Sequence, residues 1–244
     1  MATRKYKYFI LTGEPGVGKT TLTKKISAVI ASRGIKTTGF YTEEVRKNRT
    51  REGFDVVTLD GVRGRLARDQ NLLSGPVKHK VGKYGVLIQE FENVAMPSLL
   101  DNTDAHLLVI DEIGKMEFFS EPFKTAIRTI FNPSSNCNVL ATIPVRKGDQ
   151  LIESIRNNSQ AKVWMVSKSL RQGMLLQNLF ERVTTALERK GHKKDHGWVL
   201  VSKSLTLLQK KKARSFMYSS IRFWNLLAYF HFMKLYSSTT HFHP

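Results

Sequence analysis

Short runs of apolar residues alternate along this chain with longer segments in which apolar residues recur every three or four positions. Residues 8–11 form the first run, and residues 21–32 follow with apolar side chains at helical spacing, among them Leu22, Ile26 and Ile30. Repeated strands and amphipathic helices are typical of an α/β protein with a mostly parallel sheet. The same alternation predicts strands at residues 37–45, 54–59, 64–68, 85–89, 107–110, 138–143 and 162–166, and helices at residues 91–101, 121–131, 151–156 and 174–189.

One part of the chain departs from this alternation. Asp60 and Gly61 are a turn signal between the strand-like runs 54–59 and 64–68, which predicts an inserted β-hairpin. Residues 69–83 are rich in Gly, Pro, Lys and polar residues, and we expect them to form a loop.

A glycine-rich motif lies between the first expected strand and the first expected helix. It fits G-x-x-x-x-G-K-[ST], in which backbone amides and the helix amino end surround a phosphate. The lysine provides a mobile cation for the β- and γ-phosphates, and the hydroxyl is a Mg²⁺ ligand. We call these residues the phosphate loop and expect all of them to bind nucleotide: Gly13, Glu14, Pro15, Gly16, Val17, Gly18, Lys19 and Thr20.

A second motif follows the apolar run at residues 107–110, which is typical of a buried strand in a parallel sheet. Asp111 and Glu112 end this run, where parallel strands open on the ligand crevice. We expect Asp111 to hold Mg²⁺ together with Thr20, and Glu112 to act as general base for the attacking water. By itself this pattern also fits a solvated strand end.

Four sequence blocks resemble the cancer-related nucleoside-triphosphatase family of small P-loop proteins: GEPGVGKTTL, GFYTEEVR, GFDVVTLDG and VIDEIGKMEF. The resemblance extends from about residue 8 to about residue 188. It implies a three-layer, RecA-like α/β core with an inserted hairpin, and slow Mg²⁺-dependent hydrolysis of ATP, GTP and other nucleoside triphosphates. It also implies that one segment lies at the nucleotide site: Asp111, Glu112, Ile113, Gly114, Lys115, Met116 and Glu117.

Further cations could stabilise charge on the transferred phosphoryl group. We expect this catalytic role for Lys115, besides the roles of Lys19 and Glu112, although a surface lysine fits equally. Arg146, Lys147 and Arg156 follow later strands and are alternatives. Glu43 and Glu44 are adjacent in a strand, so only one can face the crevice.

The net charge of +19 is concentrated toward the carboxyl terminus. Residues 191–244 hold nine basic residues and one acidic residue, and the family resemblance ends near residue 190. We therefore expect a P-loop domain at residues 1–190 and a basic, aromatic-rich, poorly ordered tail at residues 191–244.

Basic residues also cluster around the expected hairpin. This cluster is interpreted as a solvated face, and nucleic-acid binding is possible without being favoured. The cluster contains Arg46, Arg49, Arg51, Arg63, Arg65 and Arg68.

Two other functions remain open from the sequence. The same phosphate loop serves nucleotide and nucleoside kinases, and the charge would suit a nucleotide-gated RNA- or protein-binding module. No N-K-x-D motif for guanine recognition occurs, which favours a broad base preference. The chain contains no run of about 18 apolar residues, so we expect no transmembrane segment. We also expect a monomeric, cytoplasmic protein.

Overall fold

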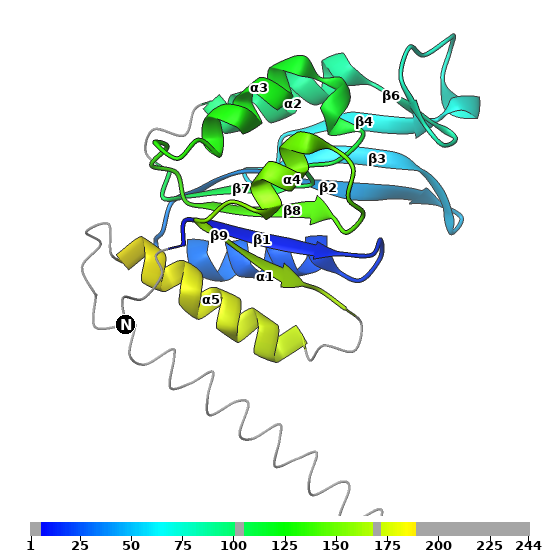
Figure 1. Cartoon of the computed structure of the whole chain (residues 1–244). Coiled ribbons are helices and arrows are strands. Elements are labelled where there is room, and N and C mark those ends of the chain that lie inside the picture. The colour runs from blue at the N-terminus through cyan, green and yellow to red at the C-terminus, as the bar shows by residue number, and fades with distance from the viewer. Residues whose placement is uncertain (1–5, 101–104, 168–171, 189–244) are drawn as a thin grey trace, which may run out of the picture. The chain divides into compact units, whose positions relative to one another are not determined.

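The computed structural model describes residues 6–100, 105–167 and 172–188. The expected tail, residues 191–244, lies outside the described residues. Within them the chain forms a nine-stranded sheet with helices on both faces (Figure 1), which confirms the predicted three-layer α/β fold. The elements in chain order are β1 (Tyr8–Gly13), α1 (Lys19–Ala31), β2 (Thr37–Lys47), β3 (Thr50–Thr58), β4 (Arg63–Asp69), η1 (Gln70–Leu72), β5 (Lys80–Val81), β6 (Tyr84–Val86), α2 (Ile88–Leu100), β7 (Leu107–Asp111), η2 (Glu117–Phe119), α3 (Glu121–Ile130), β8 (Val139–Pro144), α4 (Gln150–Arg156), β9 (Ala161–Met165) and α5 (Gln172–Glu188).

One half of the sheet is parallel, and it positions both sequence motifs. The strands β2, β7, β8, β1 and β9 are neighbours in this order and run in the same direction. β8 therefore separates β1, which leads into the phosphate loop, from β7, which ends at Asp111. The register pairs Gly13 with Pro144 and Tyr41 with Asp111. Because parallel strands end at the same edge, the phosphate loop and the acidic residues share the carboxyl edge of the sheet.

The other half of the sheet is antiparallel and larger than the expected hairpin. β2 pairs with β3, β3 with β4, β4 with β6, and β6 with β5. Residues 69–83, expected to be loop, contain η1 and β5. The strand expected at residues 85–89 is partly wrong: β6 ends at Val86, and α2 begins at Ile88. The reason is that Phe91, Ala95 and Leu99 continue a helical apolar face that is buried in the core.

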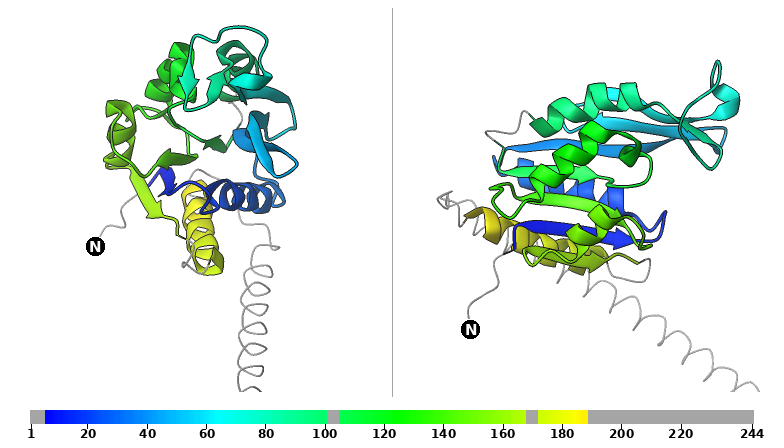
Figure 2. Two further views of the ribbon diagram at one scale, coloured as in Figure 1. Left: turned by 90° about the vertical axis from the view of Figure 1, so that its right-hand side faces the viewer. Right: turned by 45° about the horizontal axis from the view of Figure 1, so that its top comes forward.

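The helices form a layer on each face of the sheet. α1 and α5 pack together on one face, and α2 and α3 pack together on the other (Figures 1 and 2). Aromatic rings connect the second layer to the sheet: the ring centroids of Phe40 and Phe91 are 5.8 Å apart, and those of Phe91 and Phe123 are 5.3 Å apart.

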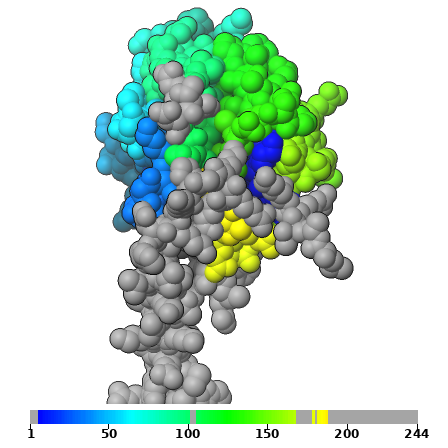
Figure 3. Space-filling model, turned by 90° about the vertical axis from the view of Figure 1, so that its left-hand side faces the viewer, coloured from blue at the N-terminus to red at the C-terminus, as the bar shows by residue number. Residues whose placement is uncertain are grey.

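Figure 3 views the molecule from the side at which the parallel strands begin, with the helical layer of α2 and α3 above and α5 (yellow) below. The phosphate loop lies at the other end of these strands. No helix in the described ranges is long and apolar enough to cross a bilayer.

Candidate functional site

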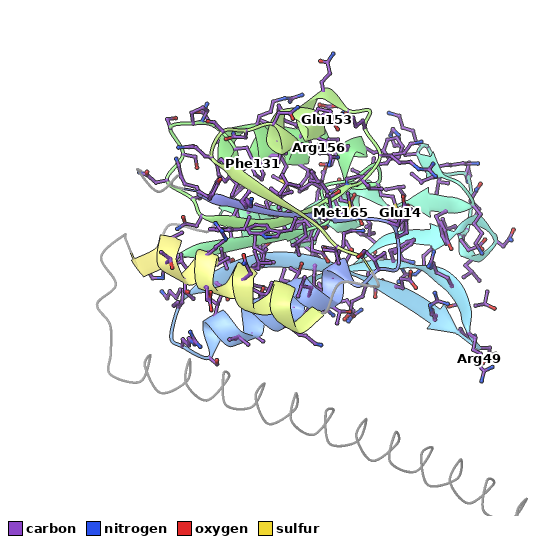
Figure 4. The ribbon with its side chains drawn as sticks, turned by 60° about the horizontal axis from the view of Figure 1, so that its bottom comes forward. Glu14, Arg49, Phe131, Glu153, Arg156 and Met165 are labelled. Carbon is purple, nitrogen blue, oxygen red and sulfur yellow. The ribbon has the colours of Figure 1, made fainter. Side chains whose placement is uncertain are left out.

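Three glycines shape the loop that follows β1. Gly16 has a φ of +75° and Gly18 a φ of +98°, in the left-handed region that favours glycine. A Cβ on Gly13 would lie 2.4 Å from the carbonyl oxygen of Val166, which leaves no room for a larger residue. Residues 14–16 are exposed. Figure 4 labels Glu14 in this loop and Met165 at the end of the neighbouring β9, where Met165 pairs with Thr12. The loop is therefore open to solvent at the carboxyl edge of the sheet.

The amino end of α1 and Lys19 supply positive charge to this loop. Gly18 occupies the position before the helix and provides no capping side chain, and the first turn of α1 contains no acidic residue. The Nζ atom of Lys19 donates hydrogen bonds to the carbonyl oxygens of Gly13 at 2.9 Å and Glu14 at 3.2 Å. The first amides of a helix carry a partial positive charge, so this end of α1 suits a phosphate group.

Asp111 lies at the carboxyl end of β7, with only 1% of its surface exposed. The hydroxyl of Thr142, on β8, donates a hydrogen bond of 2.6 Å to its Oδ1 atom. Burial raises the pKa of Asp111, while the neighbouring hydroxyls of Thr142 and Thr20 and the charge of Lys19 lower it. The structure therefore brings together Thr20 and Asp111, the two residues that the sequence suggested as metal ligands.

The surroundings of the second carboxylate oxygen of Asp111 indicate whether a divalent cation fits this site. The Oδ2 atom is buried and has no hydrogen-bond partner within the described residues. Leaving a buried carboxylate oxygen without a partner is costly, whereas coordination to a cation would satisfy it. A carboxylate beside a threonine hydroxyl also provides the oxygen ligands that Mg²⁺ prefers. The donor set present fits Mg²⁺.

Glu112 and Glu117 lie on either side of Gly114. A Cβ built on Gly114 would be 3.3 Å from Oε1 of Glu112 and 3.0 Å from Oε2 of Glu117. Burial and the negative charge of Asp111 raise the pKa of Glu112, and the charge of Lys19 lowers it. A carboxylate with a raised pKa is a stronger base, which suits general-base catalysis near neutral pH.

The remaining residues of the DEIGKME segment take different positions. The side chain of Ile113 is fully buried in the core, so only its main chain is available to a ligand. Its amide donates a 2.9 Å hydrogen bond to the carbonyl oxygen of Thr142. Lys115 is exposed.

Of the alternative cations, Arg156 contacts the carboxyl ends of β1 and β8, next to the phosphate loop. Its Nη2 atom donates a 2.6 Å hydrogen bond to the carbonyl oxygen of Pro144, and its Nη1 atom lies 3.5 Å from Oγ1 of Thr12. Its Nε atom also pairs with Glu153 at 3.2 Å, and Figure 4 shows the two side chains together on α4. Arg146 and Lys147 are exposed.

The two glutamates of β2 face opposite sides, as the strand geometry predicted. Glu43 pairs with Lys24 of α1 and with Arg63, and hydrogen bonds from these residues hold the pKa of Glu43 below its usual value. Lys24 also lies over the ring of Tyr41, with its Nζ 3.7 Å from the centroid. Glu44 pairs with basic residues near the tip of the β2–β3 hairpin. Figure 4 shows Arg49 at that tip.

The basic cluster of the hairpin region is largely compensated by acids, which the interpretation as a solvated face did not foresee. Asp55 is buried and pairs with Arg63 and Arg68, and Arg65 pairs with Glu90 at 2.6 Å. Arg46 and Arg51 both pair with Glu44.

Comparison with known proteins identifies the family. Residues 8–183 match the model of the protein family described as NTPase. The chain belongs to this NTPase family. This confirms the resemblance that was inferred from the four sequence blocks.

Similar proteins cover most of the same region. The cancer-related nucleoside-triphosphatase of Homo sapiens is 47% identical over an alignment of 180 residues, and the match covers 69% of this chain and 93% of that protein. Nucleoside-triphosphatase THEP1 of Thermotoga maritima is 38% identical over 167 residues, which are 68% and 90% of the two chains.

Two solved structures are also similar. The solution structure of a human cancer-related nucleoside triphosphatase has a TM-score of 0.62 and 43% identity, and it covers 77% of this chain and all of its own. The crystal structure of THEP1 from Aquifex aeolicus has a TM-score of 0.61 and 36% identity, with 70% and 96% covered.

Sequence reasoning missed one polar residue of the site and understated another. Thr142 was expected only as part of a buried strand, although a threonine in the apolar run of residues 139–143 was a signal for a polar contact. Glu117 was included through the family resemblance, but its burial was not foreseen. Neither residue belongs to a motif with a general chemical meaning.

Proposed function

We propose that this NTPase-family protein hydrolyses nucleoside 5′-triphosphates, ATP and GTP among them, to nucleoside diphosphate and phosphate in a Mg²⁺-dependent reaction. The observation that carries the proposal is the buried, unpartnered Oδ2 atom of Asp111 close to Thr20 and Lys19 at the phosphate loop. A Mg²⁺ ion held by Thr20 and Asp111 would neutralise charge on the phosphates.

The residues of the chain then act on the substrate in distinct ways. The amides of the phosphate loop and of the first turn of α1 bind the phosphate oxygens, and Lys19 exchanges its carbonyl partners for the β- and γ-phosphates. Main-chain groups of Ile113 and Gly114 border the same site.

Glu112 accepts the proton of the attacking water. The water oxygen forms a bond to the γ-phosphorus, and the bond from that phosphorus to the oxygen bridging to the β-phosphate breaks. The nucleoside diphosphate leaves with the electron pair of that bond. Lys115 is exposed at the same segment, and we propose that it approaches the transferred phosphoryl group when nucleotide is bound.

The substrate range is proposed to be broad. The contacts proposed above are all made to phosphates, which every nucleoside triphosphate shares. The four common ribonucleoside triphosphates should therefore be hydrolysed with similar efficiency.

Phosphate release tests this function directly. We would measure it for ATP, GTP, CTP and UTP, with Mg²⁺ and with excess EDTA, for the wild type, Lys19→Ala and Glu112→Gln. Lys19→Ala should lower turnover by about 100-fold or more, because it removes the cation at the developing charge. Glu112→Gln should lower turnover by about 100-fold while nucleotide binding is retained.

Two results would contradict the proposal. Undiminished turnover of a folded Lys19→Ala variant would show that the phosphate loop is not the active site. Phosphate transfer that depends strongly on an added nucleotide or nucleoside acceptor would indicate a kinase instead of a hydrolase.

A further inference from the structure

Glu117 is a buried acid to which the proposed mechanism has so far given no role. It is the first residue of η2, with 4% of its surface exposed. Within the described part of the chain, no Lys, Arg or His forms an ion pair with it. The next residue, Phe118, is buried in the hydrophobic core. A leucine would fill such a position at no electrostatic cost, so a carboxyl group here needs a reason.

The carboxyl group of Glu117 has two kinds of neighbour. The main-chain amides of Glu117 and Gly114 are close enough to lower its pKa. The absence of a side chain at Gly114 leaves a space, and the Oε2 atom of Glu117 and the Oε1 atom of Glu112 both border that space, at 3.0 Å and 3.3 Å from a built Cβ. The carboxyl groups of Glu117 and Glu112, the proposed general base, therefore border one space.

The electrostatic surroundings show which form of Glu117 occupies this space. Burial and the negative charge of Glu112 raise the pKa of Glu117 to about 8, although the two amides oppose this change. The carboxyl group is therefore protonated at neutral pH, and a protonated carboxyl has one O–H donor. The carboxyl group that shares the Gly114 space is that of Glu112.

We propose that Glu117 is a positioning residue for Glu112: it donates a hydrogen bond to one oxygen of the Glu112 carboxylate and so directs the other oxygen toward the attacking water. This inference rests on the proposed role of Glu112 in hydrolysis. Glu117 does not touch the substrate, and it keeps its proton throughout the reaction. A general base must be held within hydrogen-bond reach of the proton that it accepts, so loss of this contact slows the chemical step without weakening nucleotide binding.

Substitutions at Glu117 separate this role from a structural one. Glutamine keeps the size and an N–H donor, whereas leucine keeps a similar size without any donor. We would measure kcat, KM, the dissociation constant of a fluorescent ATP analogue and the melting temperature for Glu117→Gln, Glu117→Leu and Glu112→Gln. The exposed Glu121, which pairs with Lys124 at 2.6 Å, provides the control Glu121→Gln.

We expect Glu117→Leu to lower kcat by about tenfold or more, while KM and the dissociation constant change by less than about twofold. Glu117→Gln should recover most of the lost kcat, and Glu121→Gln should match the wild type. Combining Glu117→Leu with Glu112→Gln should lower kcat no further than Glu112→Gln does alone, because Glu117 acts on the rate only through the Glu112 carboxylate, which Glu112→Gln has already removed.

Two kinetic results would overturn the positioning role alone. One is an unchanged kcat in Glu117→Leu, and the other is a loss of kcat from Glu117→Leu that is just as large when Glu112→Gln is also present. A loss of kcat in Glu117→Leu that follows a lower melting temperature and is not recovered by Glu117→Gln would also overturn it. An unchanged kcat in Glu112→Gln would instead overturn the proposed function of Glu112, and the positioning role with it.

Discussion

Replacing Thr142 by valine should weaken the binding of Mg²⁺ while leaving the binding of nucleotide without metal unchanged. Valine has nearly the shape of threonine but no hydroxyl group. The side chain of Thr142 is fully buried, and its only described contact with the site is the 2.6 Å hydrogen bond to Oδ1 of Asp111. That bond leaves the Oδ2 atom, which has no partner, free to bind a cation.

The magnitude follows from the strength of this one bond. A hydrogen bond to a charged group contributes about 1.5–3 kcal/mol. Residues that orient metal ligands typically change metal affinity by about 10–100-fold, which agrees with this energy at about 1.4 kcal/mol for each factor of ten. We therefore expect the Mg²⁺ concentration for half-maximal effect to rise by at least about tenfold in Thr142→Val.

The assay titrates Mg²⁺, and in parallel Mn²⁺, against the protein with a fluorescent ATP analogue, and it measures analogue affinity in excess EDTA as the reference. Thr142→Ser, which keeps the hydroxyl, is the matched control and should stay close to the wild type. If Thr142→Val needs no more metal than Thr142→Ser, then Asp111 is not oriented by this bond or does not hold the cation.

Three further predictions concern other parts of the structure. Gly16→Ala should weaken nucleotide binding by about tenfold, because holding a non-glycine residue at the φ of +75° found at Gly16 costs about 1–2 kcal/mol. The measurement is nucleotide affinity, and Gly148→Ala, at a glycine without a positive φ, is the control. Arg68→Ala should lower the free energy of unfolding in urea by about 2 kcal/mol, because it removes a partner of a buried acid, whereas Arg65→Ala, at an exposed pair, should cost about 0.5 kcal/mol. The pKa of Glu117 is 4.5 in the unfolded state and about 8 in the folded state, so only the unfolded state ionises between these values. The free energy of unfolding of the wild type should therefore fall as the pH rises through this window. In urea unfolding, Glu117→Gln should lose less stability than the wild type between about pH 5 and about pH 8.

The parts of the fold that the sequence predicted well are those with long, regular patterns. The runs at residues 8–11 and 107–110 are continuous and apolar, so β1 and β7, two strands of the parallel half, could be assigned. The order of strands could not be assigned, because nothing local indicates that β8 lies between β1 and β7. β5 and β6, with two and three residues, are too short for an alternating pattern to appear.

In the candidate site, too, local motifs could be predicted from the sequence and contacts between distant segments could not. The phosphate loop is a local motif whose glycines, lysine and threonine each have a defined task, so its position and shape followed from the sequence. The proximity of Asp111 to Thr20 followed from the rule that parallel strands open at one edge. The contact between Thr142 and Asp111 depends on β8 and β7 being neighbours, and that adjacency became known only from the structure.

Charge shows most clearly what composition leaves out. Six arginines around the hairpin suggested a basic face, yet a count of charges cannot show that Asp55 lies between Arg63 and Arg68 in a largely buried position. Most charged side chains of this region are therefore paired with one another. Glu117, in contrast, forms no ion pair within the described residues. Pairing decides whether a charged residue stabilises the fold or shifts the protonation of its neighbour, and pairing is a property of the folded chain.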